Sequence, residues 1–206
     1  HTASPIIPPP SSITHHPSSI SHQSSSISHQ SSSISHQSSA ISNHPSPIST
    51  RAAKIKLVLT DVDGVLTDAG MYYSETGDEL KKFNTRDGMG FQLLREAGIL
   101  TGIVTSEDTA IVARRAKKLK VDFLYQGVKD KAAVLDEILD RTGLTADQVA
   151  YMGDDINDLG ILSRAGLAAC PRDAVAEIVQ KVDFQASSRG GMGCFRELVA
   201  RIVMER

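Results

Sequence analysis

Short apolar runs alternate with helix-like patterns in the part of the chain that follows residue 54. The run 55–60 is mostly apolar and predicts a buried strand that ends at Asp61. Phe91, Leu94 and Ala97 have helical spacing, so they predict a helix that Gly98 ends. The alternation continues with a strand over 99–105, a helix over 111–119, a strand over 121–125, a helix over 133–139, a strand over 149–152 and the segments 159–165, 167–170, 175–182 and 195–203.

This alternation predicts the fold class. Strands that alternate with helices of about ten residues form βαβ units, so we expect an α/β domain with a three-layer, Rossmann-like parallel sheet. Residues 71–74 and 79–84, on either side of Thr76-Gly77-Asp78, predict a small β-hairpin flap beside it. In parallel sheets, functional side chains gather at the carboxyl ends of the strands.

The composition divides the chain near residue 50. Residues 1–50 contain 19 Ser, seven of the eight Pro and all seven His, but no Gly and no acidic or basic residue. The heptad SSISHQS occurs three times over 18–38, yet only its Ile is apolar, so it cannot form a coiled-coil seam. We therefore expect a disordered Ser/His/Pro-rich leader over 1–51 and one folded domain over 52–206. Because the sequence begins with His1 rather than Met, an upstream domain is left open.

Charge and residue usage exclude several functional classes. No histidine follows His44, so the predicted domain cannot use Ser-His-Asp or Cys-His catalysis or a zinc-histidine site. The net charge is −2 with both signs interspersed, which argues against a nucleic-acid or membrane partner. Cys170 and Cys194 have no CxxC spacing, as is typical of buried thiols in the cytoplasm, where we expect this protein.

The remaining polar candidates each follow a predicted strand. The segment from Asp61 to Asp68 follows the first strand, Thr105-Ser106 the second, Lys131 the third and GDDIND at 153–158 the fourth. Asp61 and Asp63 converge only if the chain turns between them, and Gly64 permits such a turn. Clustered carboxylates favour a hard cation such as Mg²⁺, and a lysine beside it favours a phosphate-like substrate.

Each element has a simpler interpretation when taken alone. A DxD sequence can be a solvated turn, a lysine at a helix start can be a surface residue, and Asp-Asp-x-Asn-Asp can cap a helix. The combination favours an active site, because all four elements end different strands.

These motifs resemble a known family. DVDGVLTD, Thr105-Ser106, Lys131 and GDDINDL are similar to the four motifs of the haloacid dehalogenase superfamily of phosphotransferases, over about 54–205. The stretches NTRDGMG, LYQGVKDK and RGGMG further resemble its capless branch, which includes 3-deoxy-D-manno-octulosonate 8-phosphate phosphatases and nonulosonate 9-phosphate phosphatases.

The resemblance implies a mechanism. Asp61 is the expected nucleophile that forms an aspartyl-phosphate, and Asp63 the expected acid and base. Thr105, or Ser106 in its place, and Lys131 are expected to bind the phosphoryl oxygens. Mg²⁺ is expected at Asp61, the backbone carbonyl of Asp63 and Asp154, with Asp155 or Asp158 in support.

The resemblance also implies a phosphorylated sugar-acid substrate. The stretch 84–88 is expected to contact it through Asn84, Thr85, Arg86, Asp87 and Gly88, and Arg86 or Arg115 could pair with its carboxylate. Octulosonate phosphatases typically have Gly-Arg where this chain has Ser106-Glu107, and tend to have Arg where it has Gln92. Glu107, a further expected substrate contact with Lys118 expected to face it, resembles the nonulosonate enzymes more closely.

Oligomeric state and domain context also follow only from the resemblance. Capless relatives form homotetramers in which a neighbour's hairpin, here about 71–84, serves as a lid, and the Gly-rich segment 190–193 is expected to fold over the site as well. Two alternatives stay open: a phosphatase-like C-terminal domain of an acylneuraminate cytidylyltransferase, and a non-catalytic oligomerisation domain.

Overall fold

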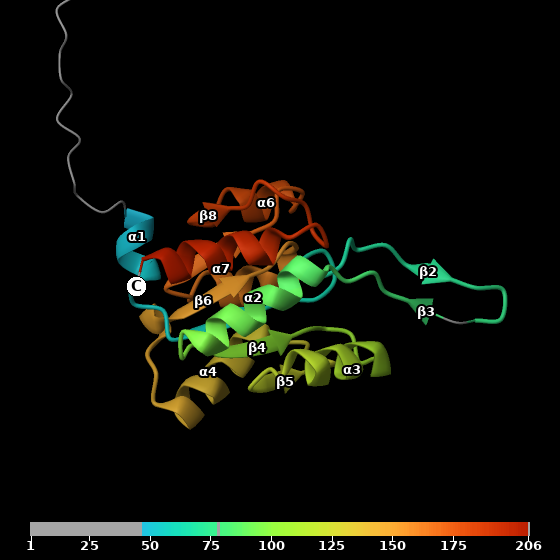
Figure 1. Ribbon diagram of the computed structural model, residues 1–206, viewed down its shortest axis with the longest axis horizontal. Helices are drawn as coiled ribbons and strands as arrows, with labels where there is room; N and C mark the ends of the chain where they lie inside the picture. The colour runs from blue at the N-terminus through green and yellow to red at the C-terminus, as the bar shows by residue number, and fades with distance from the viewer. Residues whose placement is uncertain (1–46, 78, 206) are drawn as a thin grey trace, which may run out of the picture. The chain divides into compact units, whose positions relative to one another are not determined.

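The computed structural model describes residues 47–77 and 79–205 (Figure 1). The interpretation of residues 1–46 as a leader therefore lies outside the described residues. At the boundary, the structure differs from the sequence prediction: Pro47–Ala52 forms helix α1, although residues up to 51 were assigned to the leader. Ala52 is fully buried in the core, which explains why the folded part begins before the first charged residue.

A six-stranded parallel sheet forms the centre of the domain. Its strands are β1 (Leu57–Thr60), β4 (Leu100–Val104), β5 (Phe123–Tyr125), β6 (Val149–Met152), β7 (Leu167–Cys170) and β8 (Phe184–Gln185), in the spatial order β5-β4-β1-β6-β7-β8. Every residue of β1, β6 and β7 is buried, as expected for strands covered on both faces. The sequence predicted β1, β4, β5 and β6 as strands, gave 167–170 (β7) as an unassigned segment of the alternation, and did not predict β8. Because β1 lies between β4 and β6, the chain changes direction across the sheet beside β1, where α/β proteins bind ligands.

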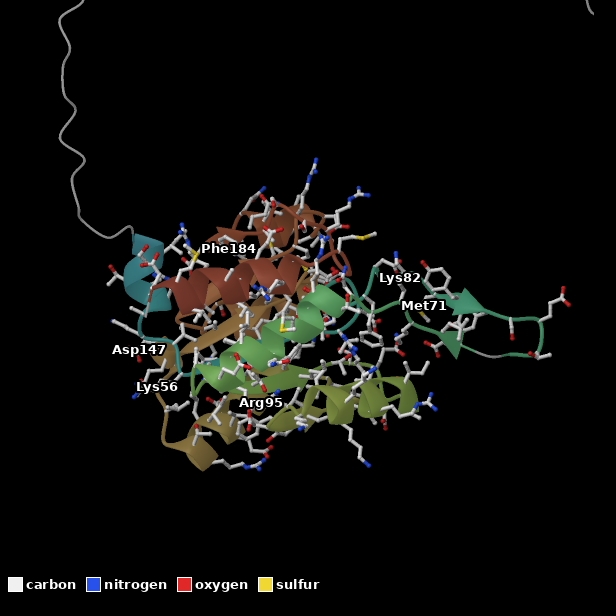
Figure 2. The ribbon with its side chains drawn as sticks, viewed as in Figure 1. Lys56, Met71, Lys82, Arg95, Asp147 and Phe184 are labelled. Carbon is white, nitrogen blue, oxygen red and sulfur yellow. The ribbon has the colours of Figure 1, made fainter. Side chains whose placement is uncertain are left out.

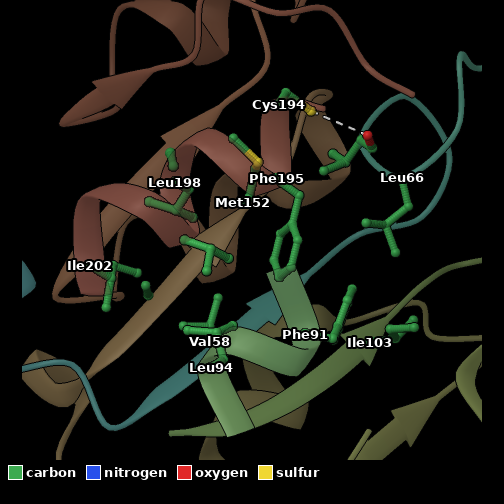
Figure 3. Close-up of a cluster of buried hydrophobic side chains, with 14 of the residues drawn as sticks. Val58, Leu66, Phe91, Leu94, Ile103, Met152, Cys194, Phe195, Leu198 and Ile202 are labelled. Carbon is green, nitrogen blue, oxygen red and sulfur yellow. Dashed lines mark hydrogen bonds between the residues drawn. The ribbon is translucent and has the colours of Figure 1, made fainter. Parts of the chain in front are cut away.

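Helices cover both faces of this sheet and complete the three layers. On one face lie α2 (Thr85–Glu96), α3 (Ala110–Leu119) and α7 (Cys194–Met204), and on the other α4 (Lys131–Thr142), α5 (Leu159–Leu162) and α6 (Ala176–Val179). Figure 3 shows α2 and α7 in contact through Phe91 and Phe195, whose rings stack with centroids 4.5 Å apart. The predicted α/β, Rossmann-like fold class is confirmed. None of the helices among residues 47–77 and 79–205 is long and apolar enough to cross a bilayer.

Local sequence signals explain several element boundaries. Gly98, in the left-handed region at φ +69°, follows α2 as predicted. Thr145 and Gln148 form a capping box at the 3₁₀ turn η1 (Ala146–Gln148) before β6, as the sequence Thr-Ala-Asp-Gln indicates. A second 3₁₀ turn, η2 (Ile156–Asp158), follows β6 with a capping box between Asp155 and Asp158.

The predicted hairpin is present and leads away from the sheet (Figure 1). Strands β2 (Tyr72–Tyr73) and β3 (Glu79–Leu80) pair antiparallel, and an isolated bridge joins Thr67 to Phe83 at the base. Figure 2 places Met71 and Lys82 at the base of the hairpin. The described residues contain this flap but no second folded layer that could serve as a cap.

Candidate active site

The chain turns sharply where β1 ends, as the Asp61–Asp63 spacing required. The backbone N–H groups of Leu66 and Thr67 both donate to the carbonyl of Val62, and Gly64 has φ +82°. This turn leaves Asp61 almost buried, with 5 % of its surface exposed, and the N–H of Val62 donates to its Oδ1 at 2.7 Å. Asp61 and Asp63 therefore lie at the same sheet edge.

A buried ion-pair network extends from Asp61 across the sheet edge. Lys131, the first residue of α4, has its Nζ 2.9 Å from Asp61 Oδ2 and 2.6 Å from Asp158 Oδ1. The hydroxyl of Tyr151 also donates to Asp158 Oδ1, at 2.6 Å. Burial alone would lower the pKa of Lys131, but the attraction of Asp61 and Asp158 raises it. The lysine therefore stays charged, and its ammonium lies directly beside the predicted nucleophile.

Three carboxylates gather at this edge. Oxygens of Asp61, Asp154 and Asp158 lie within 4.8 Å of one another. Burial, and then repulsion by Asp158, raises the pKa of Asp61 to about 6. Burial, followed by repulsion from Asp61 and Asp158, raises the pKa of Asp154 to about 8.

The donor set at this edge fits a hard cation, since it consists of crowded, partly buried oxygens. A Cβ at Gly64 would lie 1.9 Å from Asp154 Oδ2, so only glycine leaves space for that carboxylate. Asp158 is already engaged, because its Oδ2 accepts from the N–H groups of Asp154 and Asp155 at 3.0 and 3.3 Å. Asp61 and Asp154 can therefore face an ion, while Asp158 orients the loop that carries Asp154.

One cavity of about 240 Å³ contains most of the predicted catalytic groups. Its lining comes from four segments of the chain: Asp61, Asp63, Ala69, Met71, Thr105, Ser106, Glu107, Asp154, Asp155 and Asn157. Thr105 is 1 % exposed, and its hydroxyl accepts from the N–H of Glu107 at 3.3 Å. Ser106 Oγ accepts from the side-chain amide of Asn157 at 3.2 Å. The cavity thus joins carboxylates and a threonine at the carboxyl edge of the sheet, and Lys131 contacts one of its lining residues, Asp61.

The sequence interpretation missed Lys81, which lies beside this cavity. Its Nζ is 2.7 Å from Asp63 Oδ1 and 3.6 Å from Glu79 Oε1, and its side chain is 1 % exposed. Burial alone would lower the pKa of Lys81, but the hydrogen bond and charge of Asp63, together with the charges of Glu107 and Glu79, raise it. Nothing in the local sequence distinguishes Lys81 from its neighbour Lys82.

Comparisons with known proteins show the family of this chain. A family model described as haloacid dehalogenase-like hydrolase matches residues 105–195. The 3-deoxy-D-manno-octulosonate 8-phosphate phosphatase KdsC of Haemophilus influenzae is 37 % identical over 128 residues, which cover 62 % of this chain and 71 % of that protein. The chain belongs to the haloacid dehalogenase-like hydrolases. It is a phosphatase of that family.

Solved structures of this family have the same fold. The 3-deoxy-D-manno-octulosonate 8-phosphate phosphatase of Yersinia pestis is 35 % identical with a TM-score of 0.76, covering 78 % of this chain and 86 % of that one. The enzyme of the same name from Moraxella catarrhalis is 34 % identical with a TM-score of 0.76, covering 79 % of this chain and 94 % of that one. The Moraxella structure is a complex with a magnesium ion, a phosphate ion and KDO.

Two of the residues predicted to contact the sugar instead bond to other parts of this phosphatase: Asp87 to α7, and Asn84 to the segment before α7. Asp87 is 1 % exposed, and its Oδ1 accepts from the N–H of Arg196 at 2.9 Å, in the first turn of α7. Asn84 caps α2 and donates from its side-chain amide to the carbonyl of Gly191 at 3.1 Å. Burial raises the pKa of Asp87 to about 6, although backbone N–H groups near Arg196 partly oppose this shift. Asp87 is turned into the protein rather than toward the cavity beside Asp61.

Of the other predicted sugar contacts, Glu107 lines the cavity of Asp61, but four lie outside it. Thr85, Gly88 and Arg115 line a second cavity of about 280 Å³ between α2 and α3, together with Gln92 and Lys118. Arg115 donates to the carbonyl of Asn84 at 3.0 Å. Arg86 is exposed at the start of α2. Within one chain, the structure does not bring these residues to the predicted nucleophile.

Two further expectations differ from the structure. Glu107 lines the cavity of Asp61 while Lys118 lines the second one, and the described ion pairs do not join them. The segment 190–193 packs behind the loop after β1: the N–H of Gly191 donates to Val65 O at 2.9 Å, and a Cβ at Gly190 would lie 2.0 Å from Gly64 O. The glycines permit this close packing, so the segment supports the loop of Asp61 instead of folding over it.

Proposed function

We propose that this phosphatase hydrolyses a sugar-acid phosphate monoester in a Mg²⁺-dependent reaction through an aspartyl-phosphate on Asp61. One observation supports this most directly: Asp61, which lines the cavity beside the end of β1, has its Oδ2 2.9 Å from Lys131 Nζ. A carboxylate nucleophile must approach a phosphoryl group that is itself anionic. The buried ammonium of Lys131 offsets this repulsion and can neutralise charge on the equatorial oxygens.

The side chains around Asp61 divide the reaction into two steps. Asp61 attacks phosphorus in line, and the hydroxyl of Thr105 and the ammonium of Lys131 hold the phosphoryl oxygens. Asp63 gives a proton to the leaving sugar oxygen, and then takes one from the water that hydrolyses the aspartyl-phosphate. Each group is a carboxylate, hydroxyl or lysine, as a domain without histidine requires.

The acidic cluster supplies the residues for the metal. Asp61, Asp154 and the backbone carbonyl of Asp63 would hold Mg²⁺, with Asp158 and Asp155 orienting the loop from behind. When bound, Mg²⁺ supplies charge stabilisation for the phosphoryl oxygens. The raised pKa of Asp154, about 8, supports this assignment, because repulsion among carboxylates is the condition that a cation relieves.

Two ulosonic acids are candidates for the sugar. The named relatives from Haemophilus, Yersinia and Moraxella are octulosonate 8-phosphate phosphatases, which favours that substrate. Glu107 lines the cavity of Asp61, and the Ser106-Glu107 pair resembles the nonulosonate 9-phosphate enzymes. A direct comparison of the two substrates decides between them.

The exposed hairpin supports a homotetramer. Met71, Tyr72, Tyr73 and Leu80 are between 44 % and 65 % exposed, which is an unusual concentration of large apolar side chains on a surface. In the tetramer, the hairpin of one subunit would cover the cavity of the next. We propose the cytoplasm as the location, in agreement with two buried free cysteines.

The test is phosphate release from a panel of 8- and 9-phosphorylated ulosonic acids, with Mg²⁺ and with EDTA. We expect turnover of at least one member that depends on Mg²⁺ and is lost in Asp61→Asn. Mass spectrometry of the acid-quenched protein should find a phosphoryl group on Asp61. Turnover by Asp61→Asn at the wild-type rate would overturn the mechanism, and no turnover of any member would overturn the substrate class.

A further inference from the structure

Lys81 follows strand β3 of the hairpin, yet its charged end lies in the active site. Its Nζ contacts Asp63 Oδ1 at 2.7 Å, and its side chain is 1 % exposed. The neighbouring Lys82 is 53 % exposed and contacts Asp68 at 3.3 Å. A lysine is almost never fully buried without a specific partner. We therefore take Asp63 to be the specific partner that holds Lys81 at the base of the hairpin.

The two oxygens of Asp63 have different surroundings. Oδ1 has Lys81 Nζ at 2.7 Å and the hydroxyl of Thr67 at 3.2 Å. Oδ2 is buried without a hydrogen-bond partner. A buried carboxylate oxygen without a partner is costly unless a substrate or another group supplies one. Oδ2 is therefore the oxygen left for the reaction.

We propose that Lys81 is a positioning residue that occupies Oδ1 of Asp63 and so directs Oδ2 toward the reacting oxygens. This inference rests on the proposed function, in which Asp63 is the acid and base. In the first step, the proton on Oδ2 passes to the sugar oxygen as its bond to phosphorus breaks. In the second step, Oδ2 receives a proton from water as water's oxygen bonds to phosphorus and the Asp61–phosphorus bond breaks.

A purely structural role for Lys81 is the competing explanation. Glu79 Oε1 lies 3.6 Å from Lys81 Nζ, and Glu107 also attracts it electrostatically, so Lys81 could simply anchor the hairpin. The two roles differ in their dependence on the leaving group. If Lys81 positions Asp63, its replacement should slow the reaction of a substrate whose leaving group needs a proton, and should not slow the reaction of one whose leaving group needs none.

First-turnover kinetics with two substrates separate these roles. A phosphorylated sugar acid needs a proton on its leaving oxygen, whereas p-nitrophenyl phosphate leaves as a stable anion. The variants are Lys81→Met, Lys81→Arg and, as the matched control, Lys82→Met. Measuring the first turnover isolates formation of the aspartyl-phosphate from its hydrolysis, to which Asp63 contributes with both substrates.

We expect Lys81→Met to slow the first turnover of the sugar phosphate about 100-fold, the cost of a misplaced catalytic group. The p-nitrophenolate burst should stay within about twofold of wild type, because it needs no general acid. Lys81→Arg should recover part of the loss, and Lys82→Met should match wild type. Equal slowing of both substrates, or no slowing of either, would overturn the proposal. A wild-type protein that turns over p-nitrophenyl phosphate but no sugar acid would instead overturn the proposed substrate class.

Discussion

Asp158 organises the candidate site, and replacing it by asparagine tests the buried network directly. Its side chain is completely buried and accepts four hydrogen bonds. Oδ1 accepts from Lys131 and Tyr151, and Oδ2 accepts from two backbone N–H groups of the loop after β6. An asparagine has one acceptor oxygen, so its NH₂ group must face donors on one of these two sides.

The free-energy cost of this substitution combines broken hydrogen bonds with relieved charge repulsion. Hydrogen bonds to a charged group contribute about 1.5–3 kcal/mol each, and breaking a buried ion pair costs about 3–5 kcal/mol. Lys131 keeps Asp61 as a partner, and the removal of one carboxylate relieves repulsion with Asp61 and Asp154. We therefore expect a net destabilisation of about 3 kcal/mol, which lowers the Tm of a domain of this size by about 6–12 °C.

Thermal denaturation followed by circular dichroism in EDTA measures this effect without a contribution from metal. Asp155→Asn is the matched control, because Asp155 is exposed and caps η2, where asparagine is an equally good cap. It should change the free energy of unfolding by less than about 0.5 kcal/mol. If Asp158→Asn melts at the same temperature as Asp155→Asn, the buried network does not stabilise the fold as we infer.

Three further predictions follow from individual contacts. Gly64→Ala should weaken Mg²⁺ binding about 10–100-fold in calorimetry, because the added Cβ would displace the carboxylate of Asp154. Gly77→Ala is the control and should bind Mg²⁺ as wild type does, because Gly77 also has a positive φ but no atom lies within 4 Å of an added Cβ. The pKa of Asp154 is raised from 3.8 to about 8, so the metal-free protein should lose stability as the pH rises through this range, and the Tm increase caused by Mg²⁺ should grow with pH. Asp87→Asn should destabilise the fold by about 1–3 kcal/mol in urea denaturation, but leave the KM for the sugar phosphate unchanged.

Each of these expectations has a clear contrary result. Equal Mg²⁺ affinity in Gly64→Ala and wild type would remove Asp154 from the metal site. If Mg²⁺ raises the Tm by the same amount above and below pH 8, Asp154 does not release a proton when Mg²⁺ binds. A raised KM in Asp87→Asn without loss of stability would restore its predicted sugar contact.

The sheet and the position of the site could be predicted because both depend on local signals. Apolar runs and helical spacing determine which segments become strands and helices, and parallel connections bring the strand ends to one edge. Asp61, Thr105, Lys131 and Asp154 follow four different strands, so their convergence follows from the topology alone. Their catalytic and metal-binding roles stay predictions.

The interactions that could not be predicted depend on irregular backbone or on distant partners. Lys81 reaches Asp63 only because the hairpin returns to the loop after β1, and no periodicity encodes that path. Asp87 differs from an exposed helical acid only through its contact with Arg196, 109 residues further along the chain. Helix α1 was missed because its residues have the Ser- and Pro-rich composition of the leader, whereas Ala52 is buried by tertiary packing.

The charges of the buried network explain why this arrangement suits phosphoryl transfer without histidine. With Asp61, Asp154 and Asp158 ionised, Lys131 leaves a net charge of −2 on this group of side chains. A dianionic phosphate ester cannot approach such a group favourably, since the repulsion is strong in a partly buried site. In the proposed mechanism, a divalent cation would bring the group to neutrality, and Lys131 would remain beside Asp61 to meet the phosphoryl oxygens. Exchanging Lys131 for a neutral residue would therefore weaken substrate binding even with Mg²⁺ present. The two positive charges of the cation can neutralise the carboxylates or the phosphate of the substrate, but not both.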